Sequence, residues 1–236
     1  ALRAFAVAVH EVLCREYGCP IPAFHEDFDP LSELVSSLLS HRTKNTESGR
    51  AFKELRARFP TWEAVRDAHV EEVIAAIDGV TWPEQKGYRL QAVLTDITRL
   101  RGGELSLDFL ADRSPDEARA WLLAIPGVGP KTSAAVLLFS RLQVRALPVD
   151  SHHHRVAERL GLIPEGTPVG AAHALLERLM PEDWDAKKVY DHHEVFMLHG
   201  QRRCFYNAPD CPRCVVLDVC PTGERRMAAR AAVNDA

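Results

Sequence analysis

Apolar residues recur along this chain with the period of an α-helix, and this pattern limits the fold more than any other feature. In the segment PLSELVSSLLS they fall at helix positions that share one side: Leu31, Leu34, Val35, Leu38 and Leu39. The segment 88–100 repeats the pattern, and no stretch alternates polar and apolar residues as a half-buried strand would. The sequence therefore predicts an all-α protein of about ten helices.

Helix start signals locate several of these helices. Thr61 is a good N-cap for a helix expected to run through residues 62–77, and Ser114 followed by Pro115 opens another. Further helices are expected over residues 131–142, 151–161, 169–180 and 184–199. The polar, Ala-rich tail that follows the last cysteine is expected to fray.

Composition excludes some classes of protein. The 236 residues are 46% hydrophobic and 26% charged, as in a globular protein, and no apolar run is long enough to cross a membrane. The first 18 residues contain Arg3, His10 and Glu11, so they predict an amphipathic helix rather than a signal peptide, and hence a reducing compartment. The net charge of −4 means that any DNA-binding surface must be a local patch.

The segment IPGVGPKTSAAVLLFS, residues 125–140, predicts a tight hairpin between two helices. Pro126 ends the first helix, Gly127 and Gly129 can adopt positive φ, and Pro130 suits the first position of the second helix. Backbone N–H groups in such a turn can bind a phosphate oxygen. A plain connector between two helices is the alternative interpretation.

Lys131 directly follows the hairpin, and Asp150 precedes a later helix. A nucleophilic amine must be neutral, but at pH 7 an ordinary lysine with a pKa of about 10.4 is neutral in roughly 1 molecule in 2,500. A helix N-terminus and a desolvated cleft both favour the neutral form. The alternatives are a surface lysine that touches a phosphate and an aspartate that only caps its helix.

Four cysteines lie close together near the end of the chain with the spacing C-x6-C-x2-C-x5-C: Cys204, Cys211, Cys214 and Cys220. This spacing predicts a metal site. Structural zinc usually takes two C-x2-C pairs, whereas a [4Fe–4S] cluster takes four thiolates, often from one loop. We therefore favour an iron–sulfur cluster over zinc, with disulfides third. Cys14 and Cys19 are expected to be core or surface thiols.

Together these features resemble the endonuclease III family of DNA repair glycosylases, within the helix–hairpin–helix, Gly/Pro-rich loop and aspartate superfamily. The resemblance covers residues 31–221 and rests on LSELVSSLLSHRTK, IPGVGPKTSAAVLL, VDSHHHRV and YDHHEVFMLHGQRRC. Many DNA-binding proteins carry such a hairpin. The order hairpin, lysine, aspartate and four cysteines is far more specific.

The resemblance implies a fold of two α-helical lobes. A six-helix barrel with the hairpin would occupy residues 30–143, and an iron–sulfur cluster domain would combine residues 1–29 with 144–236. Duplex DNA with damaged bases or abasic sites would lie across the cleft between them, with Lys131 and Asp150 at its mouth. The protein would act as a cytoplasmic monomer, on the nucleoid if the chain is bacterial, and would bind no membrane.

The resemblance also implies a reaction. The enzyme would flip an oxidised pyrimidine such as thymine glycol out of the duplex, remove it, and cut the strand by β-elimination. Lys131 would attack the sugar and form a Schiff base, and Asp150 would assist proton transfer and stabilise charge. The four cysteines near the C-terminus would hold a structural [4Fe–4S] cluster. The expected DNA contacts are Gly127, Val128, Gly129, Arg42, Trp82 and His152.

The chain also departs from the family pattern. His41-Arg42 replaces the usual Ala-Gln, whose glutamine fills the space left by the flipped base, and Arg42 can fill it too. Trp82 either wedges into the base stack or belongs to the core. The loop FYNAPD lacks the usual basic residues, so either nearby arginines compensate or the affinity for DNA is weak. The arginines near this loop are Arg202, Arg203 and Arg213. His153 and His154 are expected on a solvated helix face.

Two other functions remain possible from the sequence. A monofunctional adenine or mismatch glycosylase would use an activated water and would usually lack a lysine at position 131. The other is a cluster-bearing DNA-binding protein with weak activity. In its extreme form, which only binds DNA or senses redox state, it would not need the pair of Lys131 and Asp150.

Overall fold

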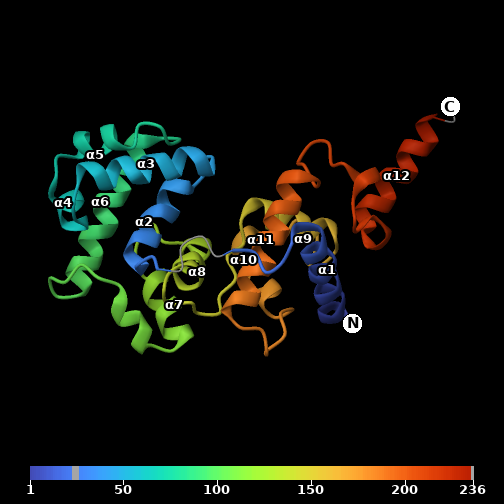
Figure 1. The fold of residues 1–236 in the computed structure, drawn as a ribbon, viewed down its shortest axis with the longest axis horizontal. Helices are drawn as coiled ribbons and strands as arrows, with labels where there is room; N and C mark the ends of the chain where they lie inside the picture. The colour runs from blue at the N-terminus through green and yellow to red at the C-terminus, as the bar shows by residue number, and fades with distance from the viewer. Residues whose placement is uncertain (23–26, 235–236) are drawn as a thin grey trace. The chain divides into compact units, whose positions relative to one another are not determined.

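The fold is built from α-helices, as the sequence predicted (Figure 1). The computed structural model describes residues 1–22 and 27–234, and no strand occurs within these ranges. The chain divides into two compact units. One combines Ala1–Phe24 with Arg145–Ala236, and the other is His25–Val144.

The unit His25–Val144 is organised around α2, which packs against α3, α6 and α8. Its helices are α2 (Pro30–Ser40), α3 (Asn45–Arg58), α4 (Trp62–Asp67), α5 (Val70–Ala76), α6 (Pro83–Leu100), the 3-10 turn η1 (Asp108–Asp112), α7 (Pro115–Leu123) and α8 (Pro130–Phe139). Residues 132–138 of α8 are all buried, and so are residues 30–35 of α2. A helix buried on every side belongs to the interior of its unit.

The other unit is organised around α11, which packs against α1 and α9. Its helices are α1 (Leu2–Tyr17), α9 (Ser151–Arg159), α10 (Val169–Glu177), α11 (Ala186–Arg202), the 3-10 turns η2 (Cys211–Arg213) and η3 (Leu217–Val219), and α12 (Pro221–Asn234). The core side chains contributed by α1 and α11 include Leu13, Val195 and Phe196, all fully buried.

Some helix boundaries differ from the prediction. The single helix expected over residues 62–77 is broken into α4 and α5, because Ala68 and His69 are extended. The side-chain amide of Gln91 donates to the carbonyl oxygens of Val65, at 2.9 Å, and Ala68, at 2.8 Å, and so satisfies groups at the break. Two helices were not predicted at all: the polar α3, and α12 in the tail expected to fray.

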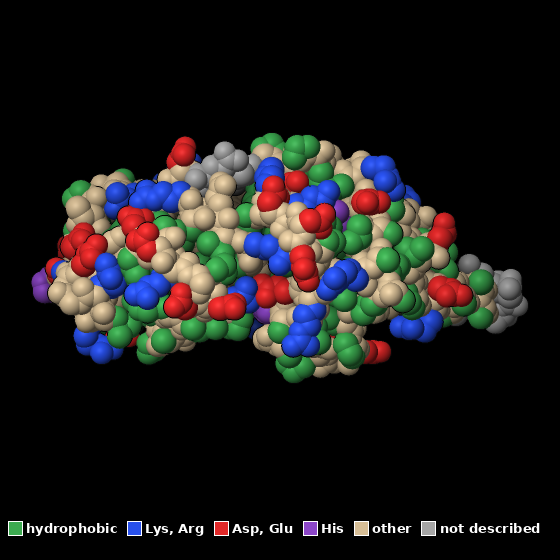
Figure 2. Space-filling view, turned by 90° about the horizontal axis from the view of Figure 1, so that it is seen from below, with side chains coloured by type: hydrophobic (Ala, Val, Ile, Leu, Met, Phe, Trp, Pro, Cys, Tyr) green, Lys and Arg blue, Asp and Glu red, His purple; other side chains and the backbone are tan. Residues whose placement is uncertain are grey.

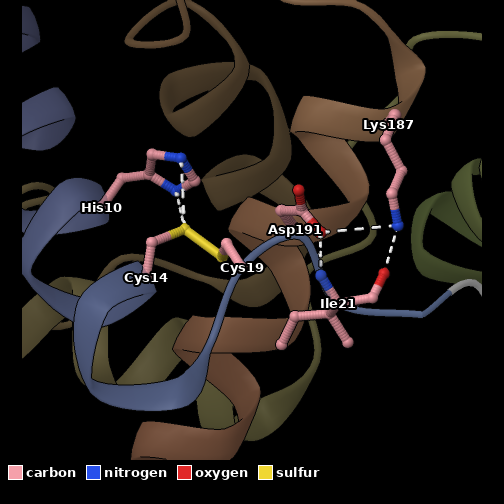
Figure 3. Close-up of a disulfide and its surroundings, with 6 residues drawn as sticks. All are labelled: His10, Cys14, Cys19, Ile21, Lys187 and Asp191. Carbon is pink, nitrogen blue, oxygen red and sulfur yellow. Dashed lines mark hydrogen bonds and ion pairs between the residues drawn. A yellow bond between two sulfur atoms is a disulfide. The ribbon is translucent and has the colours of Figure 1, made fainter.

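Cys14 and Cys19 form a disulfide, so the expectation that both are thiols is wrong (Figure 3). The chain doubles back after α1 because Gly18 adopts a φ of 83°, a left-handed conformation that suits glycine. The N–H groups of Gly18 and Cys19 both donate to the carbonyl of Cys14, at 2.9 and 3.0 Å. This turn brings the second cysteine beside the first.

Beyond the disulfide, the chain is fastened to α11 through the backbone of Ile21 (Figure 3). The N–H of Ile21 donates to Asp191 at 2.8 Å, and the ammonium of Lys187 donates to the Ile21 carbonyl. Lys187 and Asp191 also form an ion pair at 3.6 Å. The segment that leaves α1 is therefore held at both its disulfide and its next backbone groups.

A cluster of buried histidines fills part of the core between α1, α9 and α11. His153 is fully buried and stacks on Phe196 with 4.6 Å between ring centroids, so its expected place on a solvated face is wrong. The reason is that it lies on the side of α9 that also buries Val156. The ring of His192 is 5.3 Å from that of His153 and 5.4 Å from that of His10.

The cluster is built from uncharged imidazoles. Burial lowers the pKa of His10 to about 4 and that of His153 and His192 well below 6.5, and neighbouring charges lower each further. Both ring nitrogens of His153 and Nδ1 of His192 lack a hydrogen-bond partner among the described residues. His154, the other residue expected in solvent, is half-buried, with Nε2 2.7 Å from the Thr167 carbonyl.

We expect the chain to lose stability as the pH falls below 6.5. The folded-state pKa of these histidines lies below the unfolded value, so the unfolded chain binds more protons than the folded chain. The free energy of unfolding should therefore decrease as the pH drops from 6.5 toward about 4, the pKa of His10. His153→Phe, which keeps a ring against Phe196, should flatten this loss in urea unfolding at pH 7 and pH 5. The exposed His69→Gln serves as the control. A wild-type slope in His153→Phe would contradict the prediction.

Candidate active site and cysteine loop

The predicted hairpin connects α7 and α8. Ser114 and Glu117 form a capping box at the start of α7. In the turn, Gly127 has a φ of 90°, and the N–H of Val128 donates to the carbonyl of Ile125 at 3.0 Å. Gly129 is the N-cap of α8. A Cβ atom at Gly127 would lie 3.4 Å from Arg89 Cδ, so the side chain of α6 also limits what fits there.

The hairpin residues expected to contact DNA differ in exposure. Gly127 and Gly129 are exposed, whereas the side chain of Val128 is only 5% exposed. Because its N–H is already bonded to Ile125, Val128 anchors the turn from inside. The exposed surface of the hairpin is therefore glycine backbone together with the start of α8, where helical N–H groups have no partner one turn back.

Lys131, in the first turn of α8, is half-buried and faces α2. Its Nζ donates to the hydroxyl of Ser37 at 3.3 Å. The next residue, Thr132, has its Oγ1 3.0 Å from Nε2 of His41. Glu33 and Ser37 lie four residues apart on α2, and His41 is the C-cap of that helix. We call these three residues the polar face of α2, and Ser37 and His41 both contact the start of α8.

This polar face has unusual electrostatics. Burial raises the pKa of Glu33 to about 8, and the charge of Lys131 opposes that rise. The pKa of His41 falls to about 4 because of burial first, and then because of Lys131, Lys86 and Arg89. Near pH 7, Glu33 is therefore largely protonated and His41 is neutral.

Lys86 of α6 holds the C-terminus of α2. Its buried ammonium donates to the carbonyls of Leu39 and His41 at 2.7 and 2.8 Å, and to the Thr43 hydroxyl at 2.8 Å. Burial lowers the pKa of Lys86 to about 8. A cation at the last carbonyls of a helix satisfies groups that otherwise lack partners.

Sequence reasoning missed Glu33, Ser37, His41 and Lys86 as parts of this site. A signal was present for three of them, because Glu33, Ser37 and His41 recur at four-residue spacing in a leucine-rich segment. Buried polar side chains destabilise a fold unless they form hydrogen bonds. Their presence in a helix that packs in the core therefore indicates a functional role.

Arg42 and Trp82 lie together on the same unit. The guanidinium of Arg42 is 5.7 Å from the centre of the Trp82 ring, within the range of a cation–π contact. Trp82 is 51% exposed, so it is not a core residue. Both residues have positive φ, 52° and 55°, and strained conformations of this kind concentrate at functional sites.

Thr81 fixes the backbone of this pair. Its hydroxyl donates to the carbonyl of Arg42 at 2.9 Å, and its N–H donates to the hydroxyl of Thr43 at 3.1 Å. Thr43 in turn accepts from Lys86. The exposed Arg42 and Trp82 are therefore carried on a loop that the buried lysine supports.

Asp150 caps α9 in the other unit, as one interpretation of the sequence had it. Its Oδ1 accepts from the N–H of His153 at 2.7 Å, and the residue is half-buried. Glu194 of α11 lies near it: burial raises the pKa of Glu194, and the charge of Asp150 adds to the rise. Lys131 belongs to the unit His25–Val144, and Asp150 belongs to the other unit.

His152 is fixed by its neighbours. The guanidinium of Arg155 donates to its Nδ1 at 3.0 Å. Gly200 of α11 passes so close that a Cβ atom there would be 2.7 Å from the Cβ of His152. Glycine is therefore required at position 200 for α11 to approach α9 at this point.

The four cysteines near the C-terminus line one cavity, together with Arg159, His199 and Gly223. Arg159 donates to Sγ of Cys204 at 3.2 Å, and the N–H of Gly223 donates to Sγ of Cys220 at 3.3 Å. Burial raises the pKa of Cys214 to about 11. Over residues 1–22 and 27–234, no group of three or more His, Cys, Asp or Glu side chains is arranged to hold a metal ion as it stands.

The arginines beside the cysteine loop are engaged locally. Arg203 and Arg213 both pair with Asp210, at 2.9 and 2.7 Å, and the guanidinium of Arg202 lies 5.9 Å from the centre of the Tyr17 ring. Their compensation for the missing basic residues stays a prediction. The tip of the loop instead exposes 76% of Tyr206.

Charges of both signs are mixed on the face drawn in Figure 2, where Lys and Arg alternate with Asp and Glu. Neither in α1 nor in any other described helix is there a stretch that is long and apolar enough to cross a membrane.

Residues 35–182 match the family described as HhH-GPD superfamily base excision DNA repair protein. Endonuclease III of Thermotoga maritima is 31% identical over 217 residues, which cover 92% of this chain and 94% of that protein. An Arabidopsis thaliana protein named as a DNA glycosylase is 33% identical over 183 residues, and the match covers 77% of this chain but 61% of the plant protein.

Solved structures share the fold. A trapped covalent intermediate of endonuclease III with DNA superposes with a TM-score of 0.79 over 95% of this chain and 98% of that chain, at 22% identity. A thermostable thymine-DNA glycosylase gives a TM-score of 0.74 at 20% identity, over 95% and 97% of the two chains. On the strength of the family match and the Thermotoga relative, the chain belongs to the HhH-GPD superfamily of base excision DNA repair proteins, and within it to the endonuclease III family.

Proposed function

We propose that this protein is a bifunctional DNA glycosylase and abasic-site lyase that removes oxidised pyrimidines such as thymine glycol. The observation that carries the proposal is the position of Lys131. It follows the hairpin at the start of α8, half-buried against the polar face of α2, where its amine contacts Ser37. An amine held in this way is positioned to attack a substrate, whereas a surface lysine would move freely in solvent.

The proposed reaction starts with the damaged base flipped out of the duplex, at a cost of about a few kcal/mol that damage reduces. The neutral amine of Lys131 attacks the sugar C1′, and the glycosidic bond breaks with its electron pair leaving on the base. The resulting Schiff base allows β-elimination on the 3′ side. Asp150 assists proton transfer and stabilises positive charge on the sugar.

The proposed DNA contacts come from three places. Gly127 and Gly129 offer exposed backbone at the hairpin, as a phosphate requires, with Val128 as their buried anchor. Arg42 and Trp82 fill the space that the flipped base leaves. The exposure of Trp82 and its contact with Arg42 support this role. His152 contacts the backbone. The substrate is duplex DNA with damaged bases or abasic sites, bound by a monomer.

We also propose that the four cysteines lining the cavity hold a [4Fe–4S] cluster. The donor set fits: four sulfurs share one cavity, and two of them receive hydrogen bonds from Arg159 and Gly223, as cluster thiolates commonly do. When bound, the cluster supplies a rigid link among the cysteines of a loop that is otherwise short of regular structure. Its role is structural.

Borohydride trapping tests the role of Lys131. Wild-type protein should form a covalent complex with duplexes that carry thymine glycol or an abasic site, and Lys131→Ala should form none because the Schiff base needs the amine. Lys53→Ala, an exposed lysine of α3, is the matched control and should trap normally. Trapping on the abasic site alone would rule out thymine glycol as the lesion. No trapping on either duplex, with DNA still bound, would overturn the lysine mechanism.

The exposed pair can be tested by affinity. Trp82→Ala and Arg42→Ala should each weaken binding to a duplex with an uncleavable abasic-site analogue by about 10-fold, the effect of about 1.4 kcal/mol. Binding to undamaged duplex should change less, because no space needs to be filled there. Arg50→Ala, an exposed arginine on α3, is the control. Equal losses of affinity for both duplexes would show that Arg42 and Trp82 do not fill the space left by the flipped base.

Metal analysis tests the cluster. Purified protein should contain iron and acid-labile sulfide in equal amounts and absorb visible light as iron–thiolate centres do. Cys214→Ser should lose both, whereas Cys14→Ser, outside the cavity, should keep them. Zinc in place of iron in the wild-type protein would contradict the proposal.

A further inference from the structure

His199 is a buried imidazole beside the cysteine loop that the proposed function has not used. It lies on α11, only 2% of the residue is exposed, and it lines the cavity that the four cysteines near the C-terminus share. Its Nε2 is 3.6 Å from Sγ of Cys214. Because the cysteines already supply the four thiolates that a [4Fe–4S] cluster takes, the ring has no place among the ligands.

The other nitrogen of the same ring contacts α1. The hydroxyl of Tyr17, the last residue of α1, is 3.0 Å from Nδ1 of His199. The two rings meet edge-on, with 6.1 Å between their centroids. We call this series of contacts the Tyr17–His199–Cys214 bridge. It joins the N-terminal helix, α11 and the cysteine loop, three segments that lie far apart in the sequence.

The chemistry of the three groups fixes the direction of the hydrogen bonds in this bridge. A cysteine that ligates a metal is a thiolate, which has no proton, so Sγ of Cys214 can only accept. The hydrogen of that bond must therefore be on Nε2 of His199. An uncharged imidazole with its hydrogen on Nε2 has a lone pair on Nδ1, which accepts from the hydroxyl of Tyr17.

The other sulfurs show that such donors are a common feature of this cavity. Arg159 donates to Sγ of Cys204, the backbone N–H of Gly223 donates to Sγ of Cys220, and the backbone of Val216 bonds to Cys214. Hydrogen bonds to a thiolate stabilise its negative charge. His199 differs from the backbone donors because a second side chain, Tyr17, holds its ring in the donating orientation.

We propose that His199 is a positioning residue for the cysteine loop, donating its Nε2–H to the thiolate of Cys214, and that Tyr17 orients it. The bridge thereby ties α1 to the proposed [4Fe–4S] site. This inference rests on the proposed cluster and adds to it the side chains that stabilise charge on one of its thiolates. An added electron makes those thiolates more negative, so the hydrogen bond from His199 favours the reduced state.

The test measures the reduction potential of the purified, iron-loaded protein at one fixed pH. His199→Leu fills similar space without a donor, and it should shift the equilibrium about tenfold toward the oxidised state, a fall of about 59 mV for one electron. Tyr17→Phe keeps its ring but loses the hydroxyl, so the potential should fall by less. His199→Gln keeps an N–H near the position of Nε2 and should restore most of the wild-type value. Tyr206→Phe, in the same loop but exposed, is the control.

A spectroscopic readout observes the hydrogen bond itself. Pulsed electron paramagnetic resonance of the reduced protein, labelled with ¹⁵N only in histidine, should detect a magnetic coupling between the unpaired electron and a histidine nitrogen. His199→Leu should lose this coupling, and Tyr206→Phe should keep it. Absence of the coupling from the wild-type protein would overturn the proposal even if no variant at position 199 folds.

The outcomes separate this inference from the proposed cluster. Wild-type protein without iron would overturn the cluster, and the role of His199 with it, before any variant is compared. Iron-loaded wild-type protein together with an unchanged potential in His199→Leu would overturn the role of His199 alone. An equal fall in His199→Leu and His199→Gln would also overturn it, because the effect would then come from packing and not from the donated hydrogen.

Discussion

The packing of α2 against α8 is the contact on which the candidate site depends. The two helices are buried along most of their length, so polar groups between them can be held only where each finds a partner. Ser37 meets Lys131, His41 meets Thr132, and Lys86 satisfies the end of α2. A core of purely apolar residues would be more stable here. The polar face lowers the stability of the fold, but it places the amine of Lys131 in an environment with little water.

Much of this architecture could be predicted from the sequence, because it depends on local chemistry. The hairpin follows from Pro126, Gly127 and Pro130, and the caps at Thr61 and Ser114 are where short-range rules place them. The break between α4 and α5 could not be predicted, since it depends on the amide of Gln91 reaching across from another helix. Local propensity carries no information on such partners.

The candidate site shows the same division. Lys131, Asp150 and the four cysteines near the C-terminus can be picked out from the sequence, because of their residue types and their positions relative to the hairpin and to one another. Their roles stay predictions. Glu33 escaped notice because a lone acid in an apolar helix reads as an interruption until its burial is known. His153 was misplaced for a related reason: a histidine next to two others suggests solvent, yet the packing of α9 on α11 turns this one inward. Burial is a property of the tertiary structure, so sequence patterns fix it poorly for polar residues.

The fastening of the chain after α1 has a consequence for local unfolding. A helix at a chain end usually frays independently, because little holds its far side. Here the C-terminal end of α1 is closed by the disulfide, and the next residues are bonded to Asp191 and Lys187. Opening α1 would therefore require contacts of α11 to break as well, which places the two helices in one cooperative unit. The protons of their backbone amides should then exchange with solvent together, and the N-terminal helix behaves as part of the core rather than as an appendage.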